Sequence, residues 1–369
     1  MRIMKWFAYL SYVGSMCSLS AVDNPPKWPG DATPQLSLEV YDEAFAKILG
    51  KEPKLHLLAT GFGFTEGPVY FSVRGENLGY LIFTDQIHDN INIIKWYGLD
   101  PFNQITSLSW SAPALFRHPS SIADGQTADL QGQLLTCETT GRRVSITERD
   151  GTVKTLVGFY QDKPLNSPND VIVKSDGSVW FTDPSYGCLQ FPQECYLPNN
   201  VYCFDPQTQE LIVVTEEITM PNGIAFSPDE KTLYVIDSAA IQAPHTYYPI
   251  HPHAIYAFDV VGSGRKIANK RLFASVSPGF PDGMRLDQDG NIYVGALDGV
   301  QVFDPNGKLI GKILLPKETA NLTFGGQENN ILFICSSNSV WAIKLSTKGC
   351  KPVPVLAPAS VPSSDASTK

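Results

Sequence analysis

The sequence contains no run of basic residues, and its charge is predominantly negative. Its 28 lysines and arginines are outnumbered by 37 aspartates and glutamates, which gives a net charge of -9 at pH 7. Basic clusters interleaved with aromatic residues are typical of proteins that bind phosphate backbones. Their absence excludes nucleic acid as an expected partner, and an acidic surface mainly favours solubility.

The short motifs of common hydrolases and nucleotide enzymes are also missing. The sequence has no Gly-x-Ser-x-Gly nucleophile motif, no His-Glu-x-x-His zinc motif and no phosphate-binding loop. The stretch Gly61-Phe62-Gly63 superficially resembles a dinucleotide loop. That interpretation is rejected because Glu66 stands where the third glycine should be and no helix is expected to follow.

Long apolar runs are absent except at the N-terminus. Arg2 and Lys5 precede an apolar core from Trp6 to about Leu19, and small residues then lead into a polar Asp-Asn-Pro segment. The run is too short and too rich in serine to span a bilayer comfortably. We therefore predict a signal peptide at residues 1–21, a secreted protein and no membrane partner, with a buried first helix as the alternative.

The number of cysteines fits the predicted secretion. Cleavage near Ala21 would remove Cys17 and leave six cysteines, an even number that suits an oxidising compartment. Cys188 and Cys195 are close enough within one loop to pair, although two free thiols fit the sequence equally well. The sequon Asn321-Leu322-Thr323 enters an apolar strand region, so a structural role is at least as expected there as a glycan.

One pattern is repeated along the chain: a proline with Asn or Asp, an apolar strand, a turn, and a second apolar strand. It is carried by Ser167-Pro168-Asn169-Asp170, Pro221-Asn222-Gly223 and Pro281-Asp282-Gly283, with a weaker copy at Ala123-Asp124-Gly125. The second strands begin at intervals of roughly 40 to 60 residues, the period of four-stranded propeller blades. They start near Leu81, Leu134, Val179, Leu233, Ile292 and Ile331.

These repeats predict an all-β fold, a six-bladed β-propeller with four-stranded antiparallel blades at residues 54–348. Residues 22–53 form an N-terminal extension with a short helix from Leu36 to Leu49, which Gly50 ends. The strand Lys54 to Leu58 is expected to close the ring by pairing with the C-terminal strands. Residues 349–369, rich in Pro, Ser and Ala, predict a disordered tail.

Four oxygen-bearing side chains occupy the same position in successive blades, at the start of the innermost strand. They are Glu66, Asn169, Asn222 and Asp282. In a propeller these starts converge on the central channel, and two carboxylates with two amide oxygens suit Ca²⁺ best. Mg²⁺, Mn²⁺ or Zn²⁺ are alternatives, although zinc usually prefers nitrogen or sulfur. The competing interpretation is that Asn-Gly and Asp-Gly are ordinary turn dipeptides.

The ordered set of motifs resembles the gluconolactonase, regucalcin and luciferin-regenerating-enzyme family from about Leu57 to Leu345. The similarity rests on Thr65-Glu66-Gly67-Pro68, the stretch from Ser167 to Gly187, Pro221-Asn222-Gly223 and Pro281-Asp282-Gly283-Met284. The resemblance implies a six-bladed propeller with a divalent cation, usually Ca²⁺, bound by Glu66, Asn222 and Asp282. Asn169 would contact the metal or the substrate, and secreted fungal and bacterial lactonases are the most similar branch.

Two positions depart from the family pattern. Close relatives carry Asn where this chain has Asp124, and His in a Cys-Glu-His-Gly segment where it has Cys137-Glu138-Thr139-Thr140-Gly141; Arg142-Arg143 is retained. If that His moves protons or holds substrate in the relatives, its loss here bears both on the identity of the substrate and on turnover itself.

The leading hypothesis is a metal-dependent lactone hydrolase in which the cation polarises the carbonyl and Asp282 takes a proton from water, with Asn169 assisting. Two alternatives remain: another reaction of secondary metabolism at the same site (cyclisation, isomerisation or elimination), and a non-catalytic propeller that Ca²⁺ holds together. We expect a small-molecule lactone as ligand and a monomer or weak dimer. The loops from Tyr186 to Asn200 and from Ala239 to His253 would set specificity.

Overall fold

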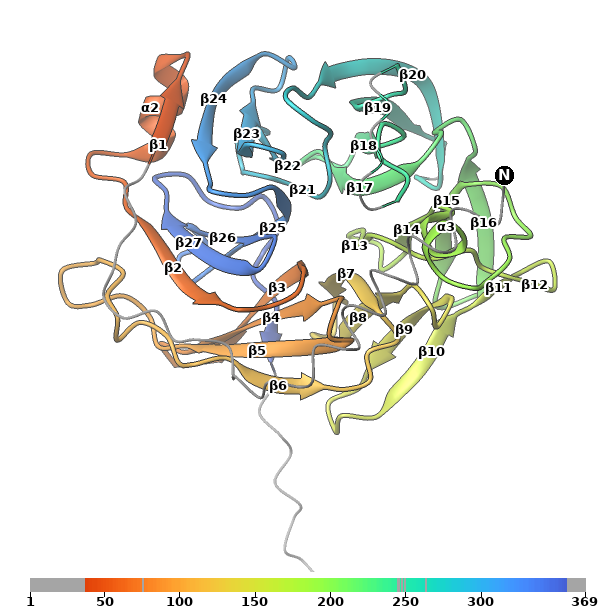
Figure 1. The fold of residues 1–369 in the computed structure, drawn as a ribbon, viewed down its shortest axis with the longest axis horizontal. Helices are drawn as coiled ribbons and strands as arrows, with labels where there is room; N and C mark the ends of the chain where they lie inside the picture. The colour runs from red at the N-terminus through yellow and green to blue at the C-terminus, as the bar shows by residue number, and fades with distance from the viewer. Residues whose placement is uncertain are drawn as a thin grey trace, which may run out of the picture.

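Six sheets of four or five strands stand around a common axis, as the computed structural model shows (Figure 1). The model describes residues 37–356 except 75, 244, 245, 247, 249 and 263. The signal peptide predicted at residues 1–21 therefore lies outside the described residues. In the part of the chain that is described, no helix is long and apolar enough to cross a membrane.

Each sheet is one blade, and its strands run antiparallel from the axis outward. Blades 1 to 3 consist of β3 (Thr65–Val73), β4 (Gly79–Asp85), β5 (Asn90–Trp96) and β6 (Ala114–Arg117); β7 (Ala123–Ala128), β8 (Leu134–Glu138), β9 (Arg143–Thr147) and β10 (Val153–Val157); and β13 (Val171–Val173), β14 (Val179–Asp183), β15 (Asn200–Asp205) and β16 (Glu210–Thr215). A small hairpin, β11 (Phe159–Tyr160) and β12 (Lys163–Pro164), links blades 2 and 3.

The second half of the ring repeats this arrangement. Blades 4 to 6 consist of β17 (Pro221–Phe226), β18 (Thr232–Asp237), β19 (Ala254–Val261) and β20 (Lys266–Ser275); β21 (Met284–Leu286), β22 (Ile292–Ala296), β23 (Gly299–Phe303) and β24 (Leu309–Leu314); and β25 (Thr319–Gly325), β26 (Ile331–Ser336), β27 (Ser339–Lys344) and β2 (Leu55–Thr60). The predicted six-bladed, four-stranded fold is confirmed.

The ring is closed by the strand that the sequence assigned to this role. β2 precedes blade 1 in the chain but pairs with β27 at the outer edge of blade 6. A first and a last segment of the propeller thus share one sheet, which leaves no unpaired gap between the two ends of the ring. Figure 1 shows β2 beside β27 and next to blade 1.

Apolar cores lie between neighbouring blades rather than at one common centre. Blades 3 and 4 meet through Trp180 and Phe226, whose rings are 5.2 Å apart in an edge-to-face contact. Blades 6 and 1 meet through Phe333 and Tyr70, which stack at 5.4 Å. Strands such as β26 are buried at every position, with Leu332 and Ile334 in one core and Ile331 and Phe333 in another, so both faces of a blade pack against neighbours.

The N-terminal extension differs from its prediction. The helix expected from Leu36 to Leu49 is shorter: Ser37–Val40 forms β1, which pairs with the outer strand β24 of blade 5, and α2 spans Glu43–Leu49. Asp42 separates the two because its carboxylate accepts a hydrogen bond from Ala44 N and caps the helix. Leu38 and Val40 satisfy a strand alternation as well as a helical one, which is why the periodicity misled.

The end predicted for the propeller at residue 348 is too early. Cys350 N donates to Leu286 O, and β28 (Val355–Leu356) pairs in parallel with β3 at the edge of blade 1. Backbone pairing holds this segment despite its Pro-rich composition. The remainder of the predicted tail, residues 357–369, lies outside the described residues.

Candidate functional site

The four predicted site residues lie at equivalent places around the axis. Glu66 and Asn222 are the second residues of the inner strands β3 and β17, whereas Asn169 and Asp282 lie in the turns just before β13 and β21. Glu66, Asn169 and Asn222 are buried, and Asp282 is partly exposed. The inner strands surround the axis in Figure 1, and the four residues belong to four different blades.

Hydrogen bonds and charge interactions connect these residues into one group. The side chain of Asn222 hydrogen-bonds the carboxyl of Asp282, and the charges of Glu66 and Asp282 repel each other through the protein interior. Asn169 joins through its amide, because Nδ2 donates to Asp124 Oδ2 at 2.9 Å. The structure therefore brings the predicted residues together, and their assignment as metal ligands remains a prediction.

Asp124 is a site residue that the prediction omitted. It lies in β7 at the position that Glu66 and Asn222 hold in blades 1 and 4, and it is 9% exposed. The signal was present, since Ala123-Asp124-Gly125 repeats the turn pattern of the other blades. By accepting from Asn169 Nδ2, Asp124 turns the amide of Asn169 so that its carbonyl oxygen is the atom left free.

Blade 6 contributes the remaining equivalent residue, Asn321. Its Nδ2 donates to Glu66 Oε2 at 2.9 Å, and its Oδ1 accepts from Leu322 N at 2.8 Å. Asn321 is 2% exposed, so the nitrogen that a glycan would modify is buried and already bonded. The sequon is structural, and every blade supplies one Asp, Glu or Asn to the axis.

The glycines that follow these residues are required by packing and not only by turn conformation. A Cβ on Gly223 would lie 2.5 Å from Asp282 O, and one on Gly67 would lie 2.1 Å from Asp124 O. Each glycine thus lets a blade press its turn against the site residue of the next blade. Asn-Gly and Asp-Gly at the axis are therefore more than ordinary turns, because a side chain there would push two site residues apart.

The electrostatics of the group favour a bound cation. Burial, reinforced by Asp124 and the other nearby carboxylates, raises the pKa of Glu66 well above its usual range, and burial together with Asp282 does the same for Asp124. Burial raises the pKa of Asp282 to about 7 even though Asn222 bonds to it. Acids crowded together in a low-dielectric region cannot all ionise unless a positive charge joins them.

One nearby acid already has its counter-ion. Asp170, the neighbour of Asn169, is 1% exposed and faces Arg285, whose Nη1 is 3.4 Å from Asp170 Oδ2. Arg285 also points its Nη2 at Gln126 O of blade 2. Arg285 reaches from blade 5 towards blades 2 and 3 and pairs with Asp170, whereas no lysine, arginine or histidine of the described residues pairs with Glu66, Asp124 or Asp282.

The group fits a hard divalent ion by its chemistry. In the described residues no three His, Cys, Asp or Glu side chains lie together closely enough to form a metal site by themselves. A cation at the axis would thus be held by a mixture of carboxylate and amide oxygens, which is the ligand set typical of Ca²⁺. Nitrogen and sulfur ligands, which zinc prefers, do not belong to the group.

The segment that lacks the family's His has a structural role. Glu138 is fully buried and accepts hydrogen bonds from Arg143 Nε at 2.7 Å, Arg117 Nη2 at 2.9 Å and Ser145 Oγ at 2.6 Å. The two guanidinium groups and the hydroxyl satisfy its charge, with Arg143 and Ser145 coming from blade 2 and Arg117 from β6 of blade 1. Glu138 is therefore held by a structural ion-pair network that joins blades 1 and 2.

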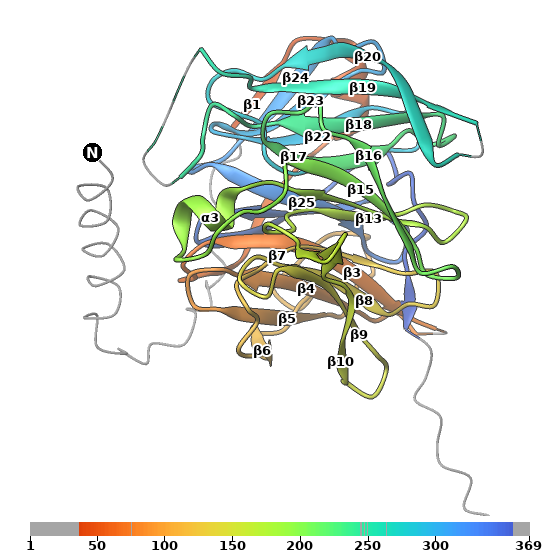
Figure 2. The same cartoon turned by 90° about the vertical axis from the view of Figure 1, so that its right-hand side faces the viewer.

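The insertion between β14 and β15 lies next to the site. It begins with α3 (Tyr186–Gln190) and contains a disulfide between Cys188 and Cys195, which confirms that predicted pair. Figure 2 shows α3 at one face of the disc formed by the blades. The other described cysteines, Cys137, Cys203, Cys335 and Cys350, are free thiols.

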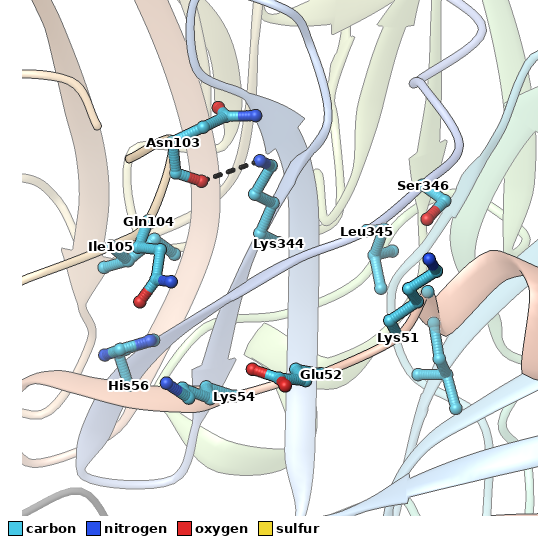
Figure 3. A pocket seen from close by; sticks show the side chains of 12 residues that line it. Lys51, Glu52, Lys54, His56, Asn103, Gln104, Ile105, Lys344, Leu345 and Ser346 are labelled. Carbon is cyan, nitrogen blue, oxygen red and sulfur yellow. Dashed lines mark hydrogen bonds between the residues drawn. The ribbon is translucent and has the colours of Figure 1, made fainter. Parts of the chain in front are cut away.

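The cavity in Figure 3 is separate from this site. It has a volume of about 190 Å³ and lies at the outer edge of blade 6, where His56 of β2 and Lys344 of β27 face the loop that contains Asn103. Lys344 Nζ donates to Asn103 O at 2.8 Å across it. None of the predicted site residues lines this cavity, so it is no part of the axial site.

Fold and site together define a six-bladed propeller with one Asp, Glu or Asn from each blade at its axis. Residues 64–338 match the model of the SMP-30/Gluconolactonase/LRE-like region family, and the chain belongs to that family. The resemblance predicted from the motifs is thereby confirmed.

Individual relatives support the same family assignment. A gluconolactonase of Zymomonas mobilis is 29% identical over 319 residues, covering 82% of this chain and 84% of its own length. The structure of a gluconolactonase from Xanthomonas campestris is similar, with a TM-score of 0.71 and 30% identity over 88% of this chain and 99% of that one. The lactonohydrolase oryL of Aspergillus oryzae is 28% identical over 212 residues, covering 54% of this chain and 49% of that protein.

Proposed function

We propose that the protein is a lactone hydrolase of the gluconolactonase type that depends on a divalent cation, Ca²⁺, at the propeller axis. The observation that carries the proposal is the group of Glu66, Asp124 and Asp282, two buried carboxyls and one partly exposed carboxyl for which the described residues supply no counter-ion. The family supports it, because its members include proteins named gluconolactonase and lactonohydrolase. Glu66, Asn222 and Asp282 would hold the cation, with Asn169 beside them. When bound, the cation supplies Lewis-acid polarisation of the ester carbonyl.

Asp282 is suited to act as the general base. Burial raises the pKa of its carboxyl to about 7 in the metal-free protein, and a bound cation would lower that pKa so that the carboxylate is available as a base at neutral pH. The water oxygen forms a bond to the carbonyl carbon while its proton passes to the Asp282 carboxylate. The ring C–O bond then breaks, and the leaving alkoxide takes that proton back to give the hydroxy acid.

Asn169 and Asn222 position these reacting groups. Asn222 holds the Asp282 carboxyl through a hydrogen bond, and Asp124 fixes the amide orientation of Asn169, so that one oxygen of Asn169 is available to the metal or the substrate. Partly exposed Asp282 is the member of the group that solvent reaches. A substrate would thus approach the carboxyl from the open side of the site.

The experiment is a lactone panel assayed with Ca²⁺ and with chelator. We expect hydrolysis of aldonolactones or aromatic lactones that stops on chelation and in Glu66→Gln, and a loss on the order of 10² to 10⁴ in kcat for Asp282→Asn. Asp289→Asn, an exposed acid of the same blade, is the matched control and should retain full activity. Bound metal without turnover of any lactone would indicate a binding propeller instead.

Secretion is proposed on separate grounds. The predicted signal peptide at residues 1–21 and the Cys188–Cys195 disulfide both favour an oxidising compartment. N-terminal sequencing of the protein recovered from the culture medium, with cleavage near Ala21, tests this.

A further inference from the structure

A tyrosine hydroxyl outside the predicted ligand set is buried beside the site. Tyr186 opens α3, its ring is partly exposed, and its hydroxyl oxygen is shielded from solvent. The hydroxyl lies within hydrogen-bonding reach of the Asn222 and Ser238 side chains and near the charge of Asp282. Among the described residues, none forms a well-aligned hydrogen bond with it.

Two of the neighbouring side chains direct their own protons elsewhere, so neither donates to the Tyr186 hydroxyl. The Ser238 hydroxyl donates its proton to Pro281 O, and the Asn222 side chain bonds to Asp282. A buried donor without a partner costs about 1–3 kcal/mol and is uncommon in native proteins. Such a group is retained where a ligand completes its hydrogen bond.

The insertion is built to hold Tyr186 in this place. Gly187 N donates to Ser167 Oγ at 2.8 Å, and Ser167 Oγ donates to Pro184 O at 2.6 Å. Gln193 Nε2 donates to Asn166 O at 3.1 Å. The Cys188–Cys195 disulfide closes the loop that contains Gln193. These contacts fix the backbone of the insertion against blade 3 on both sides of Tyr186, so its side chain is anchored beside the site before any ligand binds.

We propose that the Tyr186 hydroxyl donates a hydrogen bond to the carbonyl oxygen of the substrate at this site. The proposal rests on the proposed function, because the oxygen concerned is that of a lactone. As water adds to the carbonyl carbon, this oxygen becomes negative and the hydrogen bond strengthens; as the ring C–O bond breaks, the charge leaves it. Tyr186 keeps its proton throughout, in agreement with burial raising the pKa of its phenol.

Tyr186→Phe tests the role because it removes only the oxygen. We expect kcat to fall by on the order of 10², with KM and the Kd for Ca²⁺ within about twofold of wild type because the interaction strengthens in the transition state. The unfolding temperature should not fall, because the hydroxyl makes no well-aligned hydrogen bond to any of the described residues. A fall in stability together with weaker Ca²⁺ binding would show a structural role and overturn the proposal.

Tyr196→Phe is the matched control. Tyr196 belongs to the same insertion, but it is 52% exposed and its hydroxyl donates to Glu194 Oε2 at 2.9 Å. Its removal should leave kcat, KM and metal affinity unchanged. Equal losses in both variants would assign the effect to the loop as a whole and contradict the specific role of Tyr186.

A binding measurement keeps the result independent of turnover. A cyclic phosphonate carries tetrahedral, charged oxygens like the adduct formed by water, so its Kd for the Ca²⁺-loaded protein should rise on the order of 10² in Tyr186→Phe and stay constant in Tyr196→Phe. If wild type hydrolyses no lactone but this difference holds, the proposed reaction fails and the donor role stands. If wild type hydrolyses lactones and Tyr186→Phe changes neither kcat nor phosphonate binding, the donor role fails alone.

Discussion

Raising the pH should destabilise the metal-free protein while strengthening its binding of Ca²⁺. The reason is the carboxyl of Asp282, whose pKa is raised from 3.8 to about 7 by burial beside other acids. Between these two values the folded protein carries a proton that the unfolded chain has lost. The contribution of Asp282 to the stability of the metal-free form is therefore fully present below about pH 4 and is lost as the pH rises through 7.

The magnitude follows from the size of the shift. A change of about 3 pKa units corresponds to about 4 kcal/mol of unfolding free energy between pH 4 and pH 8 from Asp282 alone. Ca²⁺ binds the deprotonated carboxylate, so its affinity should weaken about tenfold for each pH unit below 7, or on the order of 10² from pH 7 to pH 5. Glu66 and Asp124, whose pKa values are also raised, act in the same direction.

Chemical denaturation with chelator and with Ca²⁺, together with calorimetric titration of Ca²⁺, measures both effects from pH 4 to pH 9. Asp282→Asn is the decisive comparison. In the presence of chelator, the variant should be more stable than wild type at pH 8 and equally stable at pH 4. Added Ca²⁺ should raise its unfolding free energy only slightly. A chelated wild-type protein that becomes more stable between pH 4 and pH 8, or a Ca²⁺ affinity that is flat across this range, would refute the reasoning.

Three further predictions follow from particular contacts. Gly223→Ala should cost about 1–3 kcal/mol in unfolding free energy and weaken Ca²⁺ binding, because the new Cβ would lie 2.5 Å from Asp282 O; denaturation and calorimetry test this, and an unchanged Kd would contradict it. Arg285→Met should destabilise the protein by about 3–5 kcal/mol because Asp170 would be left buried without its cation, and Asp170→Asn in the same chain should recover part of that loss. Asn321 should carry no glycan in secreted protein, as peptide mass spectrometry before and after glycosidase treatment would show.

The ring of blades was predictable because its signals are local. Apolar strands, Asp-Gly turns and the repeat period specify each blade without reference to its neighbours, and the second strands predicted near Leu134, Val179 and Ile292 begin at those residues. The short helix was harder, since Leu38 and Val40 fit a strand and a helix alike and only the edge of β24 decides between them.

The site was predictable in part for the same reason. Glu66, Asn222 and Asp282 are marked by a repeated turn, whereas the meaning of Asp124 depends on its partner Asn169 in another blade. The Tyr186 hydroxyl is marked by no motif at all, because its importance comes from its burial beside Asn222 and Asp282 without a well-aligned partner among the described residues.

The same contacts that form the site also join the blades, which links metal binding to the stability of the whole ring. Gly125 N donates to Asn169 O, and Gly223 N donates to Asp282 O, so the turn of one blade is tied to the site residue of the next. A cation shared by residues of blades 1, 3, 4 and 5 would bridge sheets that otherwise meet mainly through apolar faces. Ca²⁺ should therefore raise the unfolding free energy of the propeller as a single unit, and hydrogen exchange should slow in the inner strands of all blades and not only in the turns that carry ligands.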